Sequence, residues 1–483
     1  MRLVTLGAVA AAVLLAALFY LTFIDRSPAH LAALVPSDMR WGVFYRSIDD
    51  LRRAYEGPFL RTDVDCAKVR IGGMINAPDF EGVLQQAPIG SYRNRDGEEI
   101  FLVPFFDLDA YEGAFETNRE NVILRPPHRA AANYVSVSTS PARASRGADN
   151  PLVLRALEYP IAAAGRPADG RELRSMLFDL LSRESRREPP GIFPLWREVA
   201  KLPDAVAHPI AAACADLVVG VVAATTPEAS PHLELVATPA EGGLLARAGP
   251  VAREVDLGSC VRALPVQTVL FFGASLDDRA WRGLGLPWDV GDAACVAAII
   301  HSRHRARYNS LLVVVRPREA ARVASIDARA LLGAPAAPCE FTETAVDATP
   351  IRTAKLDTPP AWLDTLLASD HREPPPVYLS TAAADGFWYA AVGAWAEDVV
   401  RKAIDCQRGR NELSIAADRR IPLPERFFRP GHAVIALATV TGLEALSYPM
   451  PYLDIASIGL PASATLVVDV APGRVTGEIR LGR

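Results

Sequence analysis

A short phrase occurs twice in the chain, as YRSIDDLRRAYEG at positions 45–57 and as FGASLDDRAWRG at positions 272–283. Each copy contains the end of an apolar run, a serine, an aliphatic residue and two aspartates, followed by an aromatic residue two positions before a glycine. The two serines, Ser47 and Ser275, lie in different halves of the 483-residue chain. A repeat of this kind predicts two related modules, which we place at 28–245 and 251–483.

Apolar and β-branched runs at similar places in both halves predict strands. These runs lie at 41–46, 98–104, 132–138, 266–273, 295–300, 311–315, 377–381 and 387–392. Helices are expected after Ser47, Asp107 and Ser275, and over 317–324 and 394–404; hairpins are expected at 216–238 and 465–482. The pattern predicts an α+β fold in which each module is a split βαβ (ferredoxin-like) arrangement with added helices and a terminal hairpin.

Polar residues at the start of the expected helices have a structural explanation. Ser47 and Asp107 are residue types that accept a backbone N–H at a helix N-cap, and the acidic pairs at 49–50 and 277–278 favour the positive helix end. Such pairs could also serve acid–base catalysis, but duplicated capping explains them without it. Module one also contains a helical insertion whose apolar face we expect to pack in the core: Leu173, Met176, Leu177, Leu180 and Leu181.

The N-terminal segment from Leu3 to Ile24 contains no charged residue and is long enough for a helix to cross a bilayer. It predicts a transmembrane signal anchor over residues 1–26, with a cleaved signal peptide as the alternative. Because Arg2 precedes the span and Asp25 and Arg26 cancel each other, the positive-inside rule places the N-terminus in the cytoplasm. The sequence therefore predicts a single-pass protein of the bacterial inner membrane with a periplasmic or extracellular body.

Composition excludes one large class of partners. The chain carries 51 basic and 56 acidic residues, a formal net charge of −5, whereas nucleic-acid binding requires a clustered basic surface. The six cysteines include no C-x-x-C motif, so neither zinc nor thioredoxin-like chemistry is indicated. In an oxidising compartment they could form up to three disulfides; the alternative is that several are small buried apolar residues.

No motif in the sequence identifies a catalytic, cofactor-binding or metal-ligating residue. P-loop, G-x-S-x-G and H-E-x-x-H patterns are absent. An H-x-x-H spacing, His301 and His304, lies among Arg303, Arg305 and Arg307, whose positive charges would repel a metal cation. These five residues are weak candidates for contacting an acidic partner or a phospholipid head group, and a solvated loop is the simpler interpretation.

The segments LAALVPSDMRWGVFYRSIDDL (31–51) and VYLSTAAADGFWYAAVGAWAEDVVRKAI (377–404) give the chain a family resemblance. Together with the N-terminal span, they resemble bacterial membrane-anchored, extracytoplasmic proteins of unknown function built from tandem α+β modules. The resemblance implies a fold and carries no active site.

The leading hypothesis is therefore a non-enzymatic binding or scaffold protein of the bacterial envelope, held to the membrane by its N-terminal helix and contacting an envelope protein. One alternative is an envelope hydrolase with an unrecognised site between the modules. The other is a carrier of a lipid or small apolar ligand. Neither a cofactor nor a particular oligomeric state is predicted.

Overall fold

The structure is a computed structural model. It describes residues 27–55, 67–119, 124–141, 147–182, 211–222, 232–241, 256–275, 293–303, 306–317, 340–357, 375–410, 431–439 and 463–482, with a few shorter pieces between them. The chain divides into two compact units, unit 1 over Met1–Thr238 and unit 2 over Pro239–Arg483.

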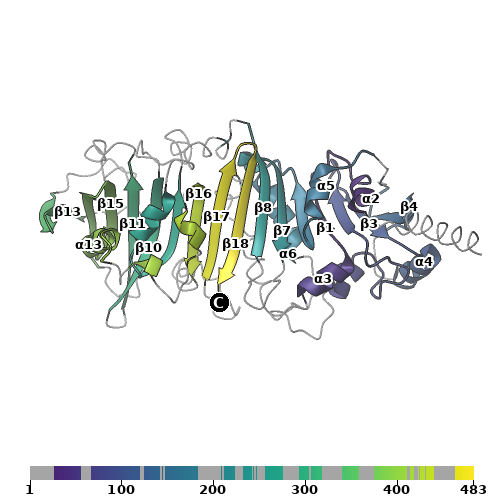
Figure 1. Cartoon of the computed structure of the whole chain (residues 1–483). Coiled ribbons are helices and arrows are strands. Elements are labelled where there is room, and N and C mark those ends of the chain that lie inside the picture. The colour runs from purple at the N-terminus through teal and green to yellow at the C-terminus, as the bar shows by residue number, and fades with distance from the viewer. Residues whose placement is uncertain are drawn as a thin grey trace, which may run out of the picture. The chain divides into compact units, whose positions relative to one another are not determined.

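Unit 1 is built mainly from antiparallel strands (Figure 1). Its strands are β1 (Trp41–Tyr45), β2 (Ile89–Arg93), β3 (Glu99–Pro104), β4 (His128–Ala131), β5 (Tyr134–Ser138), β6 (Ile161–Gly165), β7 (Cys214–Val222) and β8 (His232–Pro239). Its helices are α2 (Pro28–Ala32), α3 (Ile48–Tyr55), the π-helix η1 (Lys68–Gly72), α4 (Leu108–Thr117), α5 (Pro151–Ala156) and α6 (Gly170–Ser182). The paired strands run in the order β4-β5-β3-β2-β1-β6-β7.

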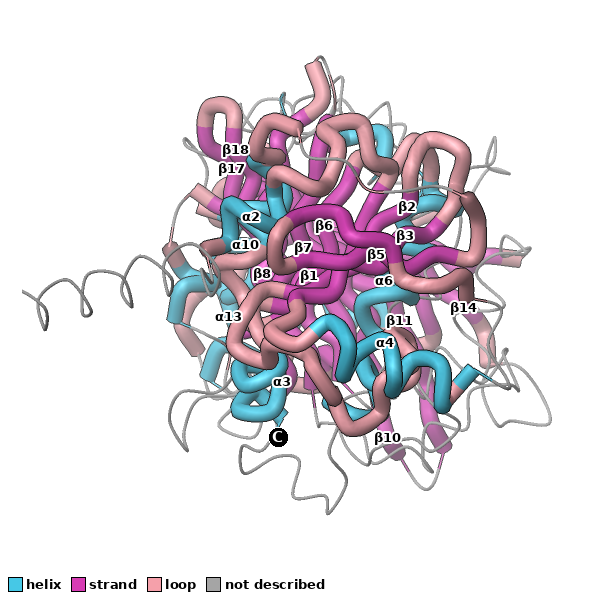
Figure 2. The backbone as a smooth tube through the Cα atoms, turned by 90° about the vertical axis from the view of Figure 1, so that its right-hand side faces the viewer, coloured by secondary structure: helices cyan, strands magenta, loops and turns pink. Residues whose placement is uncertain are grey.

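Helices cover both faces of the sheet of unit 1. Successive side chains of a strand point to opposite faces, so each strand contributes residues to both. Phe44 belongs to a buried cluster with residues of α2 and α5, whereas its neighbour Trp41, three positions earlier, donates its indole N–H to Asp179 of α6. Figure 2 shows α2 and α6 on different sides of these strands. The predicted apolar face of the inserted helix is confirmed as core, since Leu173, Met176 and Leu180 are all buried.

Unit 2 is also dominated by antiparallel strands. Its strands are β9 (Thr268–Ala274), β10 (Ala293–Arg303), β11 (Ala306–Arg316), β12 (Thr342–Val346), β13 (Thr349–Leu356), β14 (Val377–Ala384), β15 (Phe387–Gly393), β16 (His432–Thr439), β17 (Ser463–Ala471) and β18 (Arg474–Gly482). Its helices are α10 (Leu257–Arg262), α13 (Ala396–Gln407) and the short 3-10 helices η6 (Ile415–Ala417) and η7 (Glu425–Phe428). The paired strands run in the order β12-β13-β14-β15-β11-β10-β9-β16-β17-β18.

The two units share one strand order. Strands β14, β15, β11, β10, β9, β16 and β17 follow one another in unit 2 as β4, β5, β3, β2, β1, β6 and β7 do in unit 1. In both, a short helix and a proline turn precede the first strand: the Met39 N–H donates to the Pro36 carbonyl at 3.2 Å, and the Thr268 N–H donates to the Pro265 carbonyl at 2.9 Å. The hairpin β12–β13 extends the edge of unit 2 beyond the position that β4 occupies in unit 1.

The predicted α+β class with ferredoxin-like modules is wrong. The described residues form 18 strands with few helices. Strands β1 and β2, which flank α3, pair directly and antiparallel, whereas a split βαβ unit places the two strands that flank its helix parallel, with another strand between them. Turns at Gly97 and at Asp385-Gly386 instead connect neighbouring strands directly, β2 to β3 and β14 to β15. The local strand signals were correct, but they do not specify which strands pair.

The membrane predictions are also corrected. Residues 1–26, including the span from Leu3 to Ile24, lie outside the described residues. Within the described part of the chain no helix is long and apolar enough to cross a bilayer, and the longest, α6, has 13 residues, whereas a spanning helix needs about 20. A single-pass protein anchored in the inner membrane with a periplasmic body therefore has no support in the structure.

The repeated serine acts as a helix cap in unit 1, as predicted. The Asp50 N–H donates to Ser47 Oγ at 2.9 Å, at the start of α3. The pKa of Asp50 lies below its ordinary value: burial raises it, but hydrogen bonds from Arg46 and Ser47 and the charges of Arg46 and Arg53 lower it by more. The serine and the second aspartate of the phrase thus stabilise the first turn of α3.

Replacing Ser47 with alanine is expected to destabilise unit 1 by about 1 kcal/mol, because the partly buried Asp50 N–H loses its acceptor. Hydrogen–deuterium exchange of the α3 amides in the intact chain measures the effect. The exposed Ser37→Ala is the matched control and should change exchange free energies by less than about 0.5 kcal/mol. Equal effects of the two substitutions would contradict the capping role.

Candidate functional site

Helix α13 is held on the sheet of unit 2 by one continuous apolar face. It packs against β11, β13, β14 and β15 (Figure 1), and its buried residues are Ala396, Val399, Val400, Ala403, Ile404 and Cys406. Their spacing of three and four positions is that of a helix with one face in the core. The helix follows β15 after only two residues, so its first turn lies close to the end of that strand.

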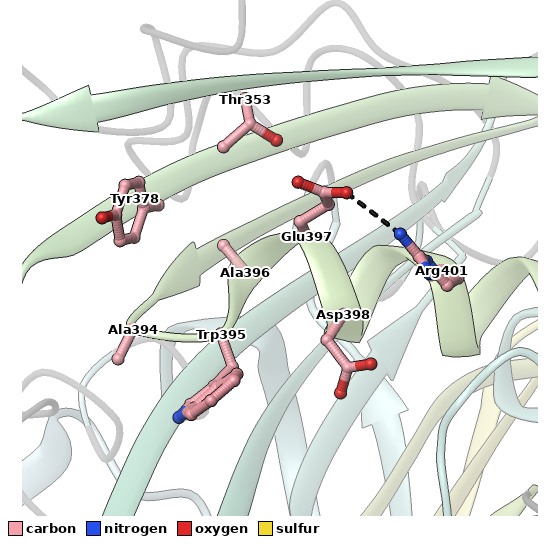
Figure 3. Close-up of a pocket in the computed structure, with 8 residues that line it drawn as sticks. All are labelled: Thr353, Tyr378, Ala394, Trp395, Ala396, Glu397, Asp398 and Arg401. Carbon is pink, nitrogen blue, oxygen red and sulfur yellow. Dashed lines mark hydrogen bonds and ion pairs between the residues drawn. The ribbon is translucent and has the colours of Figure 1, made fainter. Parts of the chain in front are cut away.

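A cavity of about 290 Å³ lies at the N-terminal end of α13. Figure 3 shows the residues that line it: Thr353 on β13, Tyr378 on β14, and Ala394, Trp395, Ala396, Glu397, Asp398 and Arg401 from the start of α13. The lining thus combines two aromatic rings, two carboxylates and one guanidinium. We refer to these eight residues as the α13 pocket.

The charged side chains of the α13 pocket are positioned by neighbours on the same helix and on the edge hairpin. Arg401 donates to Glu397 Oε1 at 3.1 Å, and Thr344 of β12 donates its hydroxyl to the same oxygen at 2.9 Å. Asp398 pairs with Lys402 at 2.8 Å. Both are i,i+4 pairs, a spacing at which side chains meet on a helix surface. Lys402 is not part of the lining, so the lining itself carries one more negative than positive charge.

The polar and aromatic members of the α13 pocket come from three different elements. Thr353 shares a hydrogen bond of 2.9 Å with Ser380 on the adjacent strand β14, which fixes its side chain. Trp395 is the N-cap residue of α13, and its carbonyl accepts the Val399 N–H at 3.0 Å. Tyr378 and Trp395 both line the cavity, and both are half-buried.

The opposite end of α13 is clamped to two hairpin turns. Arg408 donates to Asp385 and to Thr349 Oγ1, both at 2.8 Å; these residues lie at the β14–β15 and β12–β13 turns. Arg410 donates to Asp347 and, at 3.1 Å, to Asp405. Basic side chains near a helix C-terminus also interact favourably with its dipole. These contacts hold the C-terminal end of α13 at the two turns, and the pocket lies at its other end.

The site residues proposed from the sequence are not part of this pocket. The backbone places His301 and Arg303 at the end of β10 and Arg307 near the start of β11, in a hairpin that pairs Ser302 with Arg307. His304 and Arg305 lie outside the described residues, and no side-chain geometry is described for the other three. Their role as partner contacts stays a prediction. No cluster of three or more metal-ligating side chains occurs in the described part of the chain.

Sequence reasoning missed the α13 pocket because none of its residues forms a motif. Glu397 and Asp398 are ordinary first-turn acids, and Tyr378 is an ordinary strand residue. The one signal was Trp395, a large aromatic residue directly before a helix with an acidic first turn.

Comparisons with known proteins add no identity. No protein-family description, curated protein or solved structure matches the chain. The resemblance to membrane-anchored envelope proteins therefore stays a prediction, and the functional argument rests on the geometry of the α13 pocket.

Proposed function

We propose that the chain is a non-enzymatic binding protein and that the α13 pocket of unit 2 binds an organic cation, a guanidinium or alkylammonium group. The observation that carries the proposal is that Tyr378 and Trp395 line the same cavity as Glu397 and Asp398. An aromatic face attracts a cation through its quadrupole, and a nearby carboxylate adds a direct charge interaction.

The charge arrangement supports a cation over an anion. Arg401 is paired with Glu397, so its charge is largely offset within the lining. Asp398 has its cationic partner, Lys402, outside the lining, and its side chain is 42% exposed. A bound cation could therefore approach Asp398 and an aromatic ring together, whereas an anion would meet two carboxylates.

The same lining does not support the lipid-carrier alternative. A carrier needs a cavity lined by apolar side chains, and three of the eight residues of the α13 pocket are charged. A pocket of about 290 Å³ is at the small end of the usual range for ligand sites of roughly 300–1,000 Å³. It fits one charged group and its first few carbons.

Saturation-transfer NMR on the intact chain tests the proposal with four probes: tetramethylammonium, ethylguanidinium, glucose and acetate. We expect binding of the two cations and no binding of acetate. Trp395→Ala should weaken cation binding by about 2- to 5-fold, because a partly exposed cation–π contact contributes about 0.5–1 kcal/mol. Asp398→Asn should cause a similar loss, since exposed charge pairs contribute about 0.2–1 kcal/mol.

Two matched controls lie in the same unit outside the α13 pocket. Glu343 is an exposed carboxylate on β12 paired with Arg352, and Phe341 is an aromatic ring that is 39% exposed. Glu343→Gln and Phe341→Ala should leave cation binding unchanged. Stronger binding of glucose than of either cation, or equal losses from control and pocket variants, would overturn the proposed ligand class.

A further inference from the structure

Two cysteines far apart in the sequence meet in the core of unit 2. Cys260 lies on α10 and Cys295 on β10, and both are completely buried. Helix α10 packs directly against β10, and both cysteines belong to the same buried cluster in the core of unit 2. The thiols are free in the structure.

The residues around this pair favour a close approach of the two sulfur atoms. Cys295 pairs across the sheet with Gly273 of β9, and a Cβ at that glycine would lie 2.7 Å from the Cys295 Sγ atom. The missing side chain at Gly273 therefore provides the space that this sulfur occupies. Leu257, one helical turn before Cys260 and also on α10, lies against the same glycine, so Cys260 and Leu257 face the same point on the sheet.

We propose that Cys260 and Cys295 form an internal disulfide that links α10 to the sheet of unit 2. With glutathione disulfide as the oxidant, one cysteine thiolate displaces a glutathione thiolate to form a mixed disulfide. The second cysteine thiolate then attacks the protein sulfur of that bond and releases the other glutathione. The protein loses two hydrogens and two electrons, and one glutathione disulfide is reduced to two glutathione thiols.

Burial determines when the bond forms. Burial and the neighbouring Cys260 thiol raise the pKa of Cys295 well above its ordinary value, and the thiolate is the reactive species. The folded, reduced protein should therefore be oxidised slowly, and only when α10 separates from the sheet. During folding the thiols of Cys260 and Cys295 are accessible to glutathione disulfide, and the docking of α10 on the sheet then brings them together.

The experiment is refolding of the intact chain from denaturant, in a glutathione redox couple or in reduced glutathione alone. The refolded protein is unfolded again, alkylated and digested, and its cysteine peptides are identified by mass spectrometry. We expect a linked peptide containing Cys260 and Cys295 only after refolding with glutathione disulfide. The oxidised protein should unfold at a temperature several degrees above that of the reduced protein, because the link restricts the unfolded chain.

Cys406 provides the matched control. It is a free, buried cysteine on α13, and burial raises its pKa to about 12. Cys406→Ala should leave the linked peptide and its stabilisation intact, whereas Cys295→Ala should remove both. Full alkylation of Cys260 and Cys295 after oxidative refolding of the wild-type chain would overturn the proposal, as would a link from either residue to a different cysteine.

Discussion

Replacing Asp179 with alanine is expected to lower the free energy of unfolding of unit 1 by about 3 kcal/mol. Asp179 on α6 is only 8% exposed, accepts the Trp41 indole N–H at 3.0 Å and lies 3.5 Å from the Arg93 guanidinium. Arg93 also stacks on the Trp41 ring, with 5.5 Å to its centroid. Removal of the carboxylate leaves a buried donor and a partly buried cation without this partner, and breaking such a pair costs about 3–5 kcal/mol.

Hydrogen–deuterium exchange of the β1 and α6 amides measures this loss within the intact chain. Asp179→Asn keeps an acceptor for the indole and should cost less than the alanine substitution. Glu172→Ala is the control: Glu172 also lies on α6, but its ion-pair partner Arg40 is 44% exposed. Its carboxylate also accepts the Ala168 N–H at 2.9 Å at the start of the helix, so its loss should cost about 1 kcal/mol. If Glu172→Ala destabilised unit 1 as much as Asp179→Ala, the buried cluster would not be what holds α6 on the sheet.

Gly82→Ala should destabilise unit 1 by about 3 kcal/mol through backbone strain and overlap. Gly82 has a φ of +68°, and a Cβ there would lie 2.2 Å from the Asp107 carbonyl oxygen and 2.5 Å from the Tyr111 nitrogen. The Gly82 carbonyl also accepts the Phe106 N–H at 3.0 Å, so the segment cannot move away without breaking this contact. The left-handed conformation and the overlap with the backbone of α4 therefore add to each other.

Gly97 separates the two contributions. Its φ is +82°, but a Cβ there would meet only the Arg40 side chain, at 3.8 Å. Gly97→Ala should therefore carry the conformational cost alone, about 1–2 kcal/mol. Urea denaturation measures the free energy of unfolding of the two variants, and hydrogen–deuterium exchange of the α4 amides reports the local effect. A Gly82→Ala variant no less stable than Gly97→Ala would show that α4 can shift to accommodate the added carbon.

Local features of the fold were predictable from the sequence, whereas its topology was not. The strand at 41–46, the cap at Ser47 and the Asp385-Gly386 turn each depend on a few adjacent residues, and each is present. The strand order depends on contacts between residues far apart in the chain, such as the pairing of β1 with β6. Alternating apolar residues indicate a strand without indicating its neighbour, and this is why a ferredoxin-like strand order was predicted in place of the observed one.

The candidate site escaped prediction for the same reason. Thr353 and Tyr378 reach the α13 pocket only because β13 and β14 pair with a particular register. Cys295 was interpreted as a small apolar residue from its sequence neighbours, and it is indeed fully buried. Its place beside α10, which carries Cys260, depends on the docking of that helix on β10, for which the 34 residues between the two cysteines give no signal.

The edge hairpin β12–β13 extends unit 2 past the strand order that the two units share. It supplies Thr353 and Thr344 at one end of α13 and Asp347 and Thr349 at the other. The hairpin therefore adds one lining residue to the pocket and two partners to the clamp, whereas the other lining residues lie on β14 and at the start of α13. An additional hairpin at the edge of a sheet thus changes the polar surroundings of a helix that packs on it, while the order of the other strands stays the same.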